Sequence, residues 1–257
     1  MKKWLYEMSW QEAADQIKEA QGVAIIPVGS VEQHGPHLPL GTDSYVAIGL
    51  AQAAAEEANV VLAPPVWTGW CPHHMVLPGT ISIQAETMIN LILDMISSLH
   101  CHGIDKFILI NGHRIVNTVW MQIAGEKAQN QLGVTIKIFD PAYMSKDFVA
   151  AHPDMGPVGH AEEIESSHMM YMHPDLVHLE KAVDNPIQPS ELYSVDPLYA
   201  HDTLCYVPTP VSAAKKHAQK ALGITGSPSK SNVEFGKRYH EHLVKRLVKV
   251  INMLQEE

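Results

Sequence analysis

Hydrophobic residues along the chain alternate between short continuous runs and longer segments with helical spacing. The continuous runs have the length and β-branched content of buried strands, and they lie at residues 23–28, 59–63, 106–110 and 134–139. The segments with helical spacing lie at residues 44–58, 84–101 and 115–132. Strands and helices that alternate in this way form βαβ units. The pattern therefore predicts an α/β fold, with a mostly parallel central sheet in a three-layer α/β/α arrangement.

The C-terminal part of the chain has a different pattern. Residues 181–210 are irregular and rich in proline, and such long stretches often cross a subunit boundary or cover a site. Apolar residues at helical spacing return at 230–254, which predicts a final helix. No linker or repeat divides the 257 residues, of which 46% are hydrophobic and 18% charged, so we expect one domain over residues 1–257.

Residues of metal-binding types follow two of the predicted strands. Glu32, His34 and Asp43 come soon after the first strand, and His113 directly follows the third. The carboxyl ends of parallel strands meet at the crevice where α/β proteins bind ligands, so we expect these side chains to lie together. Imidazoles and carboxylates bind Zn²⁺, Mn²⁺ and Fe²⁺. The sequence therefore predicts a metal site here, with His37 either supporting it or exposed in the loop.

A third polar cluster opens a predicted helix that ends near Met172. It contains Glu162, Glu163 and Glu165, and the helix dipole favours acidic residues in a first turn. That preference accounts for one of the three glutamates. It does not account for His160, whose small neighbours leave it room to face a substrate.

In these three segments the chain resembles the creatininase family of metal-dependent amidohydrolases. The family pattern Glu-Gln-His-Gly-x-His-x-Pro-x-x-x-Asp is met by residues 32–43, and Asn-Gly-His is met by residues 111–113. Residues 159–165 match the element Gly-His-Ala-x-Glu-x-Glu, and residues 77–80 match the signature Leu-Pro-Gly-Thr. The likeness extends from Trp4 to the C-terminal helix, and it implies the same α/β/α fold.

The resemblance implies a centre of two divalent ions per chain, which would be Zn²⁺, Mn²⁺ or Fe²⁺. In this centre Asp43 bridges the two ions. Glu32 and His113 hold one ion, and His34 holds the other.

The resemblance also implies a fifth ligand and a catalytic residue. True creatininases carry a glutamate two residues after the Asn-Gly-His histidine, where this chain has Ile115. Other members have a glutamate at the position of Glu163, so the fifth ligand role passes to Glu163. His160 matches the family's catalytic histidine, which acts as a general acid/base.

Such a site implies hydrolysis of a cyclic amide or another small carbonyl substrate. Two ions can activate a shared water and polarise the carbonyl, and His160 can protonate the departing atom. A formamide deformylase or a hydrolase of a cyclic sugar ketone would use the same centre, and a non-catalytic metal-binding protein is the outside alternative. Cys71, near the expected pocket, is a weaker candidate nucleophile than water.

Two departures indicate a member that is not a true creatininase. Arg114 stands where the family usually has glycine or tyrosine. Its planar fork could bind an anionic or polar substrate, but it could equally form an ion pair or face solvent. Residues 141–160 contain no tryptophan, although true creatininases place tryptophans there to close over the substrate. Trp70 and His74, in the loop after the second strand, are the substrate-binding candidates instead.

Net charge argues against several classes of partner, so we expect a small-molecule substrate. The net charge of −10 argues against a nucleic-acid or anionic-membrane surface. We see no signal peptide or membrane-spanning run, so we expect a cytoplasmic protein. The three cysteines form no close pair, which argues against a disulfide framework. Family members that resemble this chain are often hexamers, so the resemblance implies a homo-oligomer, with a hexamer as the candidate assembly.

Overall fold

The centre of the molecule is a parallel sheet, seen in a computed structural model that describes residues 4–186 and 211–257. Within these residues the sheet has four strands in the order β2-β1-β3-β4, and every neighbouring pair is parallel. The strands are β1 Val23–Val28, β2 Val61–Leu62, β3 Lys106–Asn111 and β4 Thr135–Phe139. Strands β1 and β3 are paired along their whole length, so their carboxyl ends lie side by side.

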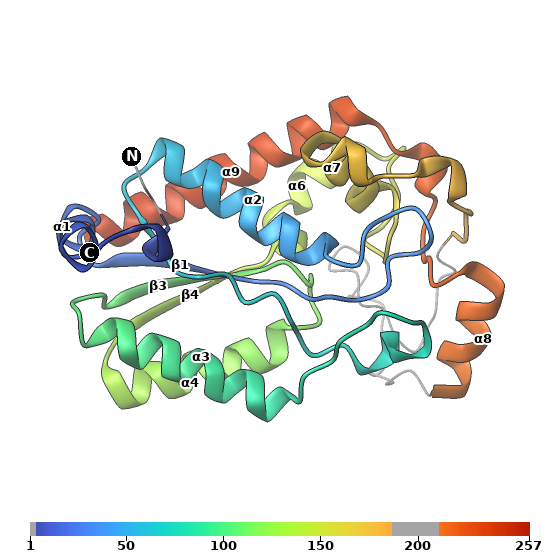
Figure 1. The fold of residues 1–257 in the computed structure, drawn as a ribbon. Helices are drawn as coiled ribbons and strands as arrows, with labels where there is room; N and C mark the ends of the chain where they lie inside the picture. The colour runs from blue at the N-terminus through green and yellow to red at the C-terminus, as the bar shows by residue number, and fades with distance from the viewer. Residues whose placement is uncertain (1–3, 187–210) are drawn as a thin grey trace.

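Helices cover both faces of the sheet, which gives three layers (Figure 1). In the view of Figure 1, α2 and α9 lie above the sheet, with α7 against α9, and α3 and α4 lie below it. The described α-helices are α1 Trp10–Glu19, α2 Thr42–Glu57, α3 Ala85–His100, α4 Thr118–Leu132, α5 Pro141–Met144, α6 Lys146–Ala150, α7 Glu163–Met172, α8 Val211–Ala221 and α9 Val233–Glu256.

The two faces of β1 pack against separate apolar cores. Val23 and Ile25 belong to the core that contains residues of α2 and α9. Ala24 and Ile26 belong to the core that contains residues of α3 and α4. Because both faces are fully buried, the strand is a continuous apolar run, and this is why the sequence pattern locates it so well.

The predicted fold class is confirmed, and the main differences lie at the ends of elements. Strand β2 has two residues and is shorter than the predicted run at 59–63. The helix predicted from residue 115 begins at Thr118, because Ile115 has a φ of 67° and lies in a left-handed turn. The apolar pattern does not predict α1 or α8. Most of the irregular stretch predicted at 181–210 lies outside the described residues.

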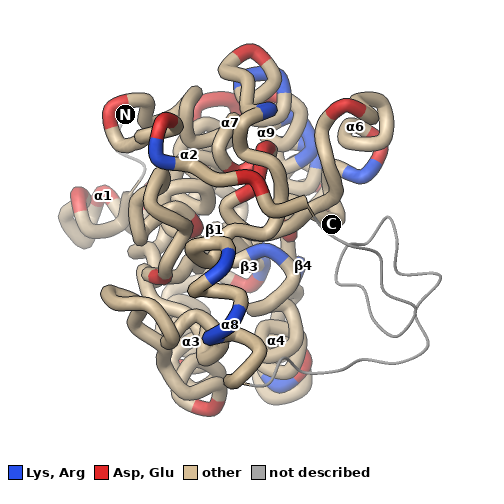
Figure 2. Tube along the Cα trace, turned by 90° about the vertical axis from the view of Figure 1, so that its right-hand side faces the viewer, with Lys and Arg blue, Asp and Glu red and all other residues tan. Residues whose placement is uncertain are grey.

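The carboxyl ends of the strands form the end of the molecule that faces the viewer in Figure 2. Helix α8 lies across this end, next to η2, the short 3-10 helix Pro72–Val76. The loops that follow β1 and β3 meet here, so the predicted metal-binding residues are on this edge. Among the helices of the described residues, none has the length and hydrophobicity of a membrane span.

Candidate metal centre

Two glycines let the ends of β1 and β3 pack directly on the first turn of α2. A Cβ atom on Gly112 would lie 2.0 Å from the backbone oxygen of Asp43, and one on Gly29 would lie 2.4 Å from the Cα of Ser44. Neither position can accept a side chain without movement of the backbone. This close approach places Asp43, at the start of α2, between the loop after β1 and the turn after β3.

The first group of candidate ligands, which we call the first triad, contains Glu32, Asp43 and His113. The Nδ1 atom of His113 lies 3.2 Å from Glu32 Oε1 and 3.1 Å from Asp43 Oδ2. All three residues are buried, and their candidate ligand atoms lie within 4.8 Å of one another. The structure therefore brings together Glu32, Asp43 and His113 as the sequence predicts.

The second triad contains His34, Asp43 and Glu165. The Nε2 atom of His34 lies 3.2 Å from Asp43 Oδ1 and 3.8 Å from Glu165 Oε2. These ligand atoms also lie within 4.8 Å of one another, and all three residues are buried. Asp43 thus presents one carboxylate oxygen to each triad, which is the arrangement of a bridging ligand.

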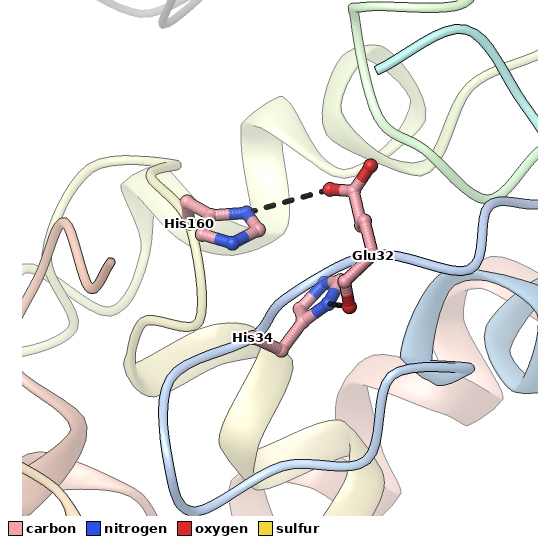
Figure 3. Close-up of side chains that lie close together, drawn as sticks. All are labelled: Glu32, His34 and His160. Atoms are coloured by element: carbon pink, nitrogen blue, oxygen red, sulfur yellow. Dashed lines mark hydrogen bonds and ion pairs between the residues drawn. The ribbon is translucent and has the colours of Figure 1, made fainter. Parts of the chain in front are cut away.

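His160 stands beside both triads, on the segment that leads into α7 (Figure 3). Its Nδ1 atom lies 3.8 Å from Glu32 Oε1, and its ring centroid lies 4.5 Å from that of His34. The side chain is 16% exposed, whereas those of Glu32 and His34 are fully buried. His160 therefore lies on the more open side of the cluster, and with Glu32 and His34 it forms a third group that could hold an ion.

His74 forms the wall next to His160. The two rings stack with their centroids 4.0 Å apart, and His74 Nε2 lies 3.2 Å from Glu32 Oε1. Burial, together with the nearby ring of His160, lowers the pKa of His74 well below its ordinary value. His74 is thus a neutral imidazole that faces the cluster, as expected of a residue in the pocket.

The buried carboxylates of the cluster have shifted pKa values, and several polar atoms of the cluster form no hydrogen bond within the part of the chain that is described. Burial and the charge of Asp43 raise the pKa of Glu32 well above its ordinary value. Burial also opposes ionisation of Asp43, but His34 and His113 hold its pKa well below the ordinary value. Among the described residues, Glu32 Oε1, Asp43 Oδ2 and His113 Nε2 have no hydrogen-bond partner.

This donor set fits divalent metal ions. Glu32 Oε1 and Asp43 Oδ2 lie 3.2 Å and 3.1 Å from His113 Nδ1 but form no hydrogen bond with it, and a bound cation would satisfy both buried oxygens. Mixed imidazole and carboxylate donors are the ligands that zinc, manganese and iron take in proteins.

Glu163, predicted as the fifth ligand, lies away from the cluster, and Glu165 is there instead. The carboxylate of Glu163 accepts hydrogen bonds from the backbone N–H groups of Gly156, at 2.8 Å, and Ser227, at 2.6 Å. Two residues apart on a helix point to nearly opposite sides, so Glu163 and Glu165 cannot both face the triads. The sequence could not choose between them, because the orientation of α7 about its axis depends on its packing against α9.

Arg114 forms a buried ion pair, which is the alternative role considered for it above. Its Nη2 atom lies 2.8 Å from Glu162 Oε1 and 2.7 Å from Glu165 Oε1. Arg114 is only 8% exposed, so the structure places it against protein carboxylates and not on an open substrate surface. Burial would raise the pKa of Glu165, but Arg114, with His34 and His160, holds it below its ordinary value.

Trp70, the other substrate-binding candidate, is half-buried and packs against the core that contains α3 and α4. Its backbone N–H donates to the side chain of Asn117 at 3.4 Å. The structure thus gives Trp70 a packing role in the loop, and it brings only His74 of this pair to the cluster.

Two residues of the site have no role in the sequence analysis. The side-chain nitrogen of Gln33 lies 2.8 Å from His74 Nδ1 and 2.9 Å from His160 Nε2, so Gln33 links both rings. Asp140, at the carboxyl end of β4, accepts a hydrogen bond from the backbone N–H of Ile115 at 2.7 Å and so fixes the turn after His113. The position of Asp140 at a third strand end is a signal that could have identified it.

Comparisons with known proteins identify the family of the chain. A family model described as "Creatininase: Creatinine amidohydrolase" matches residues 6–251. The chain is 30% identical over 182 residues to 3-dehydro-scyllo-inosose hydrolase of Thermotoga maritima. This alignment covers 69% of this chain and 58% of that protein. The chain is also 28% identical over 211 residues to creatinine amidohydrolase of Pseudomonas putida. That alignment covers 74% of this chain and 81% of that protein. The matched region thus spans less than two thirds of the Thermotoga maritima hydrolase.

Solved structures share the fold over the whole chain. A mutant creatininase of "Zn-Zn type" superposes with a TM-score of 0.80 at 22% sequence identity. A structure named "Creatininase Mn" gives a TM-score of 0.80 at 23% identity, and both alignments cover 100% of each chain. At this level of identity the likeness shows the fold.

Proposed function

The chain belongs to the creatininase family, and from this premise we propose that it is a metal-dependent hydrolase that holds two divalent ions and acts on a small carbonyl substrate. The observation that carries the proposal is the position of Asp43, with one oxygen in each of two buried triads. In this proposal Glu32 and His113 complete one metal position. His34 and Glu165 complete the other.

The chain's own residues would bind the ions and move protons. When bound, two divalent ions at these triads would supply a water of lowered pKa and a Lewis acid for the carbonyl. His160 would carry out proton transfer. Burial and the charge of His34 lower the pKa of His160 to about 3, so the free ring is neutral and starts as the base. Its Nε2 atom lies 2.6 Å from the backbone oxygen of Gln33, which can only accept a hydrogen bond. The same Nε2 atom also lies 2.9 Å from the side-chain nitrogen of Gln33, so Gln33 fixes this edge of the ring and Nδ1 is the edge that faces Glu32.

The substrate class is proposed from the relatives. The creatinine amidohydrolase supports a cyclic amide as the first candidate, and the inosose hydrolase supports a cyclic sugar ketone as the second. A formamide is a third candidate for the same centre. A preference for an anionic substrate would require a free guanidinium at Arg114. Because Glu162 and Glu165 bind that guanidinium, the proposal includes no such preference.

The proposal is tested by metal-dependent turnover. The protein is stripped of metal, reloaded with Zn²⁺, Mn²⁺ or Fe²⁺, and assayed against lactams including creatinine, against formamides and against cyclic sugar ketones. We expect hydrolysis in one class that is lost on chelation and restored by metal. The matched control is Asp43→Asn, which keeps the shape of the side chain and should be inactive with every metal. A protein that binds two ions but hydrolyses none of the panel would contradict the proposed substrate classes and favour the non-catalytic alternative.

A further inference from the structure

Arg114 follows the candidate ligand His113 directly, and its guanidinium contacts Glu165 of the second triad. We propose that Arg114 is a positioning residue that holds Glu165 in place as a ligand of the second metal position. This inference rests on the proposed function, and it assigns a role to the residue at which the chain departs from the usual family sequence.

The contacts to Glu165 divide its two oxygens between different partners. Arg114 donates to Oε1 from Nε, at 3.1 Å, and its Nη2 lies 2.7 Å from the same oxygen. The other oxygen, Oε2, accepts from the backbone N–H of Ala161 at 2.7 Å and lies 3.8 Å from His34 Nε2. With Oε1 held by Arg114, the carboxylate cannot rotate, and Oε2 stays directed at the second triad.

Glu162 binds the same nitrogen of the guanidinium that contacts Glu165. Arg114 Nη2 donates to both oxygens of Glu162, at 2.8 Å and 3.0 Å. The three side chains are nearly or fully buried. A buried ion cluster is weak evidence for stability, since desolvation of the charges offsets much of their attraction. A role in fixing the geometry of Glu165 explains better why three charges lie together beside the metal centre.

The backbone that carries Arg114 is also fixed. Ile115 has a left-handed φ of 67°, and its N–H donates to Asp140 at 2.7 Å. The N–H of Asn117 donates to the backbone oxygen of His113 at 3.3 Å. His113 and Arg114 therefore leave the same rigid turn, one toward the first triad and the other toward Glu165.

Apart from Glu165, the side chains that share a cavity with the guanidinium are neutral. Arg114 lines a small cavity with Ile164, His168 and Tyr239. Burial and the positive charges near it lower the pKa of His168 well below its ordinary value, so this ring is uncharged. Glu162 and Glu165 are thus the acidic groups that form ion pairs with Arg114 among the described residues.

The test is a calorimetric titration of metal-stripped protein with Mn²⁺ alone. The main variant is the double substitution Arg114→Met with Glu162→Gln, which removes the guanidinium without leaving Glu162 as a buried unpaired charge. Arg114→Lys keeps a positive charge but loses the planar fork, and it serves if the double variant does not fold. The control is Arg246→Met. It removes an exposed ion pair with Asp147, and neither of these residues belongs to a triad. Thermal melts check the folding of every variant.

We expect wild type and Arg246→Met to bind two ions. In the double variant one ion should bind as in wild type and the other about 10- to 100-fold more weakly, the usual loss when a residue that supports a metal ligand is removed. Arg114→Lys should show a smaller loss at the same ion. Glu162→Gln alone should fall between wild type and the double variant, since Arg114 still contacts Glu165.

Wild-type affinity for both ions in the folded double variant or in Arg114→Lys would overturn the positioning role. Equal weakening of both ions would also overturn it, because it would indicate a general loss of structure. If wild type itself fails to bind two ions, the two-metal proposal fails first, and this result is read from the wild-type titration alone.

Discussion

The two triads share Asp43 but are built in different ways. In the first triad, Glu32 and His113 come from loops that follow neighbouring strands, and glycine at 112 lets the turn after β3 pack on the backbone of Asp43. In the second triad, Glu165 comes from a helix much later in the chain, and Arg114 holds its carboxylate. The backbone of the sheet thus positions the first triad, whereas a buried side-chain ion pair positions the third member of the second.

This difference has a consequence for the strength of the two metal positions. Residues that follow the strands are held mainly by backbone hydrogen bonds and core packing, with neutral or backbone-directed contacts from Ser30 and Asp140. Glu165 depends on a charged partner, so its metal position should be the easier one to weaken by substitution without loss of the fold.

The largest effect is expected at the residue that joins the two triads. Asp43→Asn should bind neither ion with wild-type affinity, because the amide lacks the negative charge at both of its contacts, and metal-dependent turnover should be lost. Elemental analysis of the purified variant measures this directly. Full metal content in this variant would remove Asp43 from the centre and separate the two triads.

His160 lies beside both triads, and its substitution tests whether it belongs to either. His160→Ala should keep its metal and lose about 10²- to 10⁴-fold in turnover, the usual contribution of a general acid/base. Metal content and kcat are measured on the same preparation. Loss of an ion together with the ring would show instead that His160 is a ligand, through its group with Glu32 and His34.

Glu165→Gln sharpens the comparison by acting on one triad only. The variant should lose the second ion and keep the first, since Glu32, Asp43 and His113 are untouched. A titration with Mn²⁺ distinguishes one bound ion from two. Glu163→Gln is the matched control, and it should bind both ions. The reverse result would return the ligand role to Glu163.

The smallest effect on the centre, but a measurable effect on stability, is expected for Glu163→Gln. Glu163 accepts two backbone hydrogen bonds, from Gly156 and Ser227, and the neutral amide weakens both. We expect a loss of about 2 kcal/mol in the free energy of unfolding, and hence a Tm lower by roughly 4–8 °C. Thermal unfolding followed by circular dichroism provides the measurement, and an unchanged Tm would mean that Glu163 does not tie these loops together.

The same contrast explains what the sequence could predict. The strands β1 and β3 are apolar runs buried on both faces, so their positions follow from composition alone. Glu32, His34, Asp43 and His113 follow from the rule that parallel strands bring their carboxyl ends to one edge. The first triad was therefore predicted together with the sheet that carries it.

The parts that escaped prediction depend on contacts distant in sequence. Three glutamates stand at the start of α7, and only the packing of this helix against α9 decides that Glu165 faces the triads. The role of Arg114 likewise depends on where Glu162 and Glu165 lie. Helix α1 is different, because the capping box between Ser9 and Glu12 marks its start in the sequence itself.

The most direct test of the two-metal centre is anomalous diffraction from crystals of wild-type protein loaded with Zn²⁺ or Mn²⁺, recorded on both sides of the metal absorption edge. We expect two anomalous peaks in each chain. One should be bound by Glu32 and His113, the other by His34 and Glu165, with Asp43 bound to both. A single peak, or a second peak bound by Glu163 in place of Glu165, would contradict this expectation.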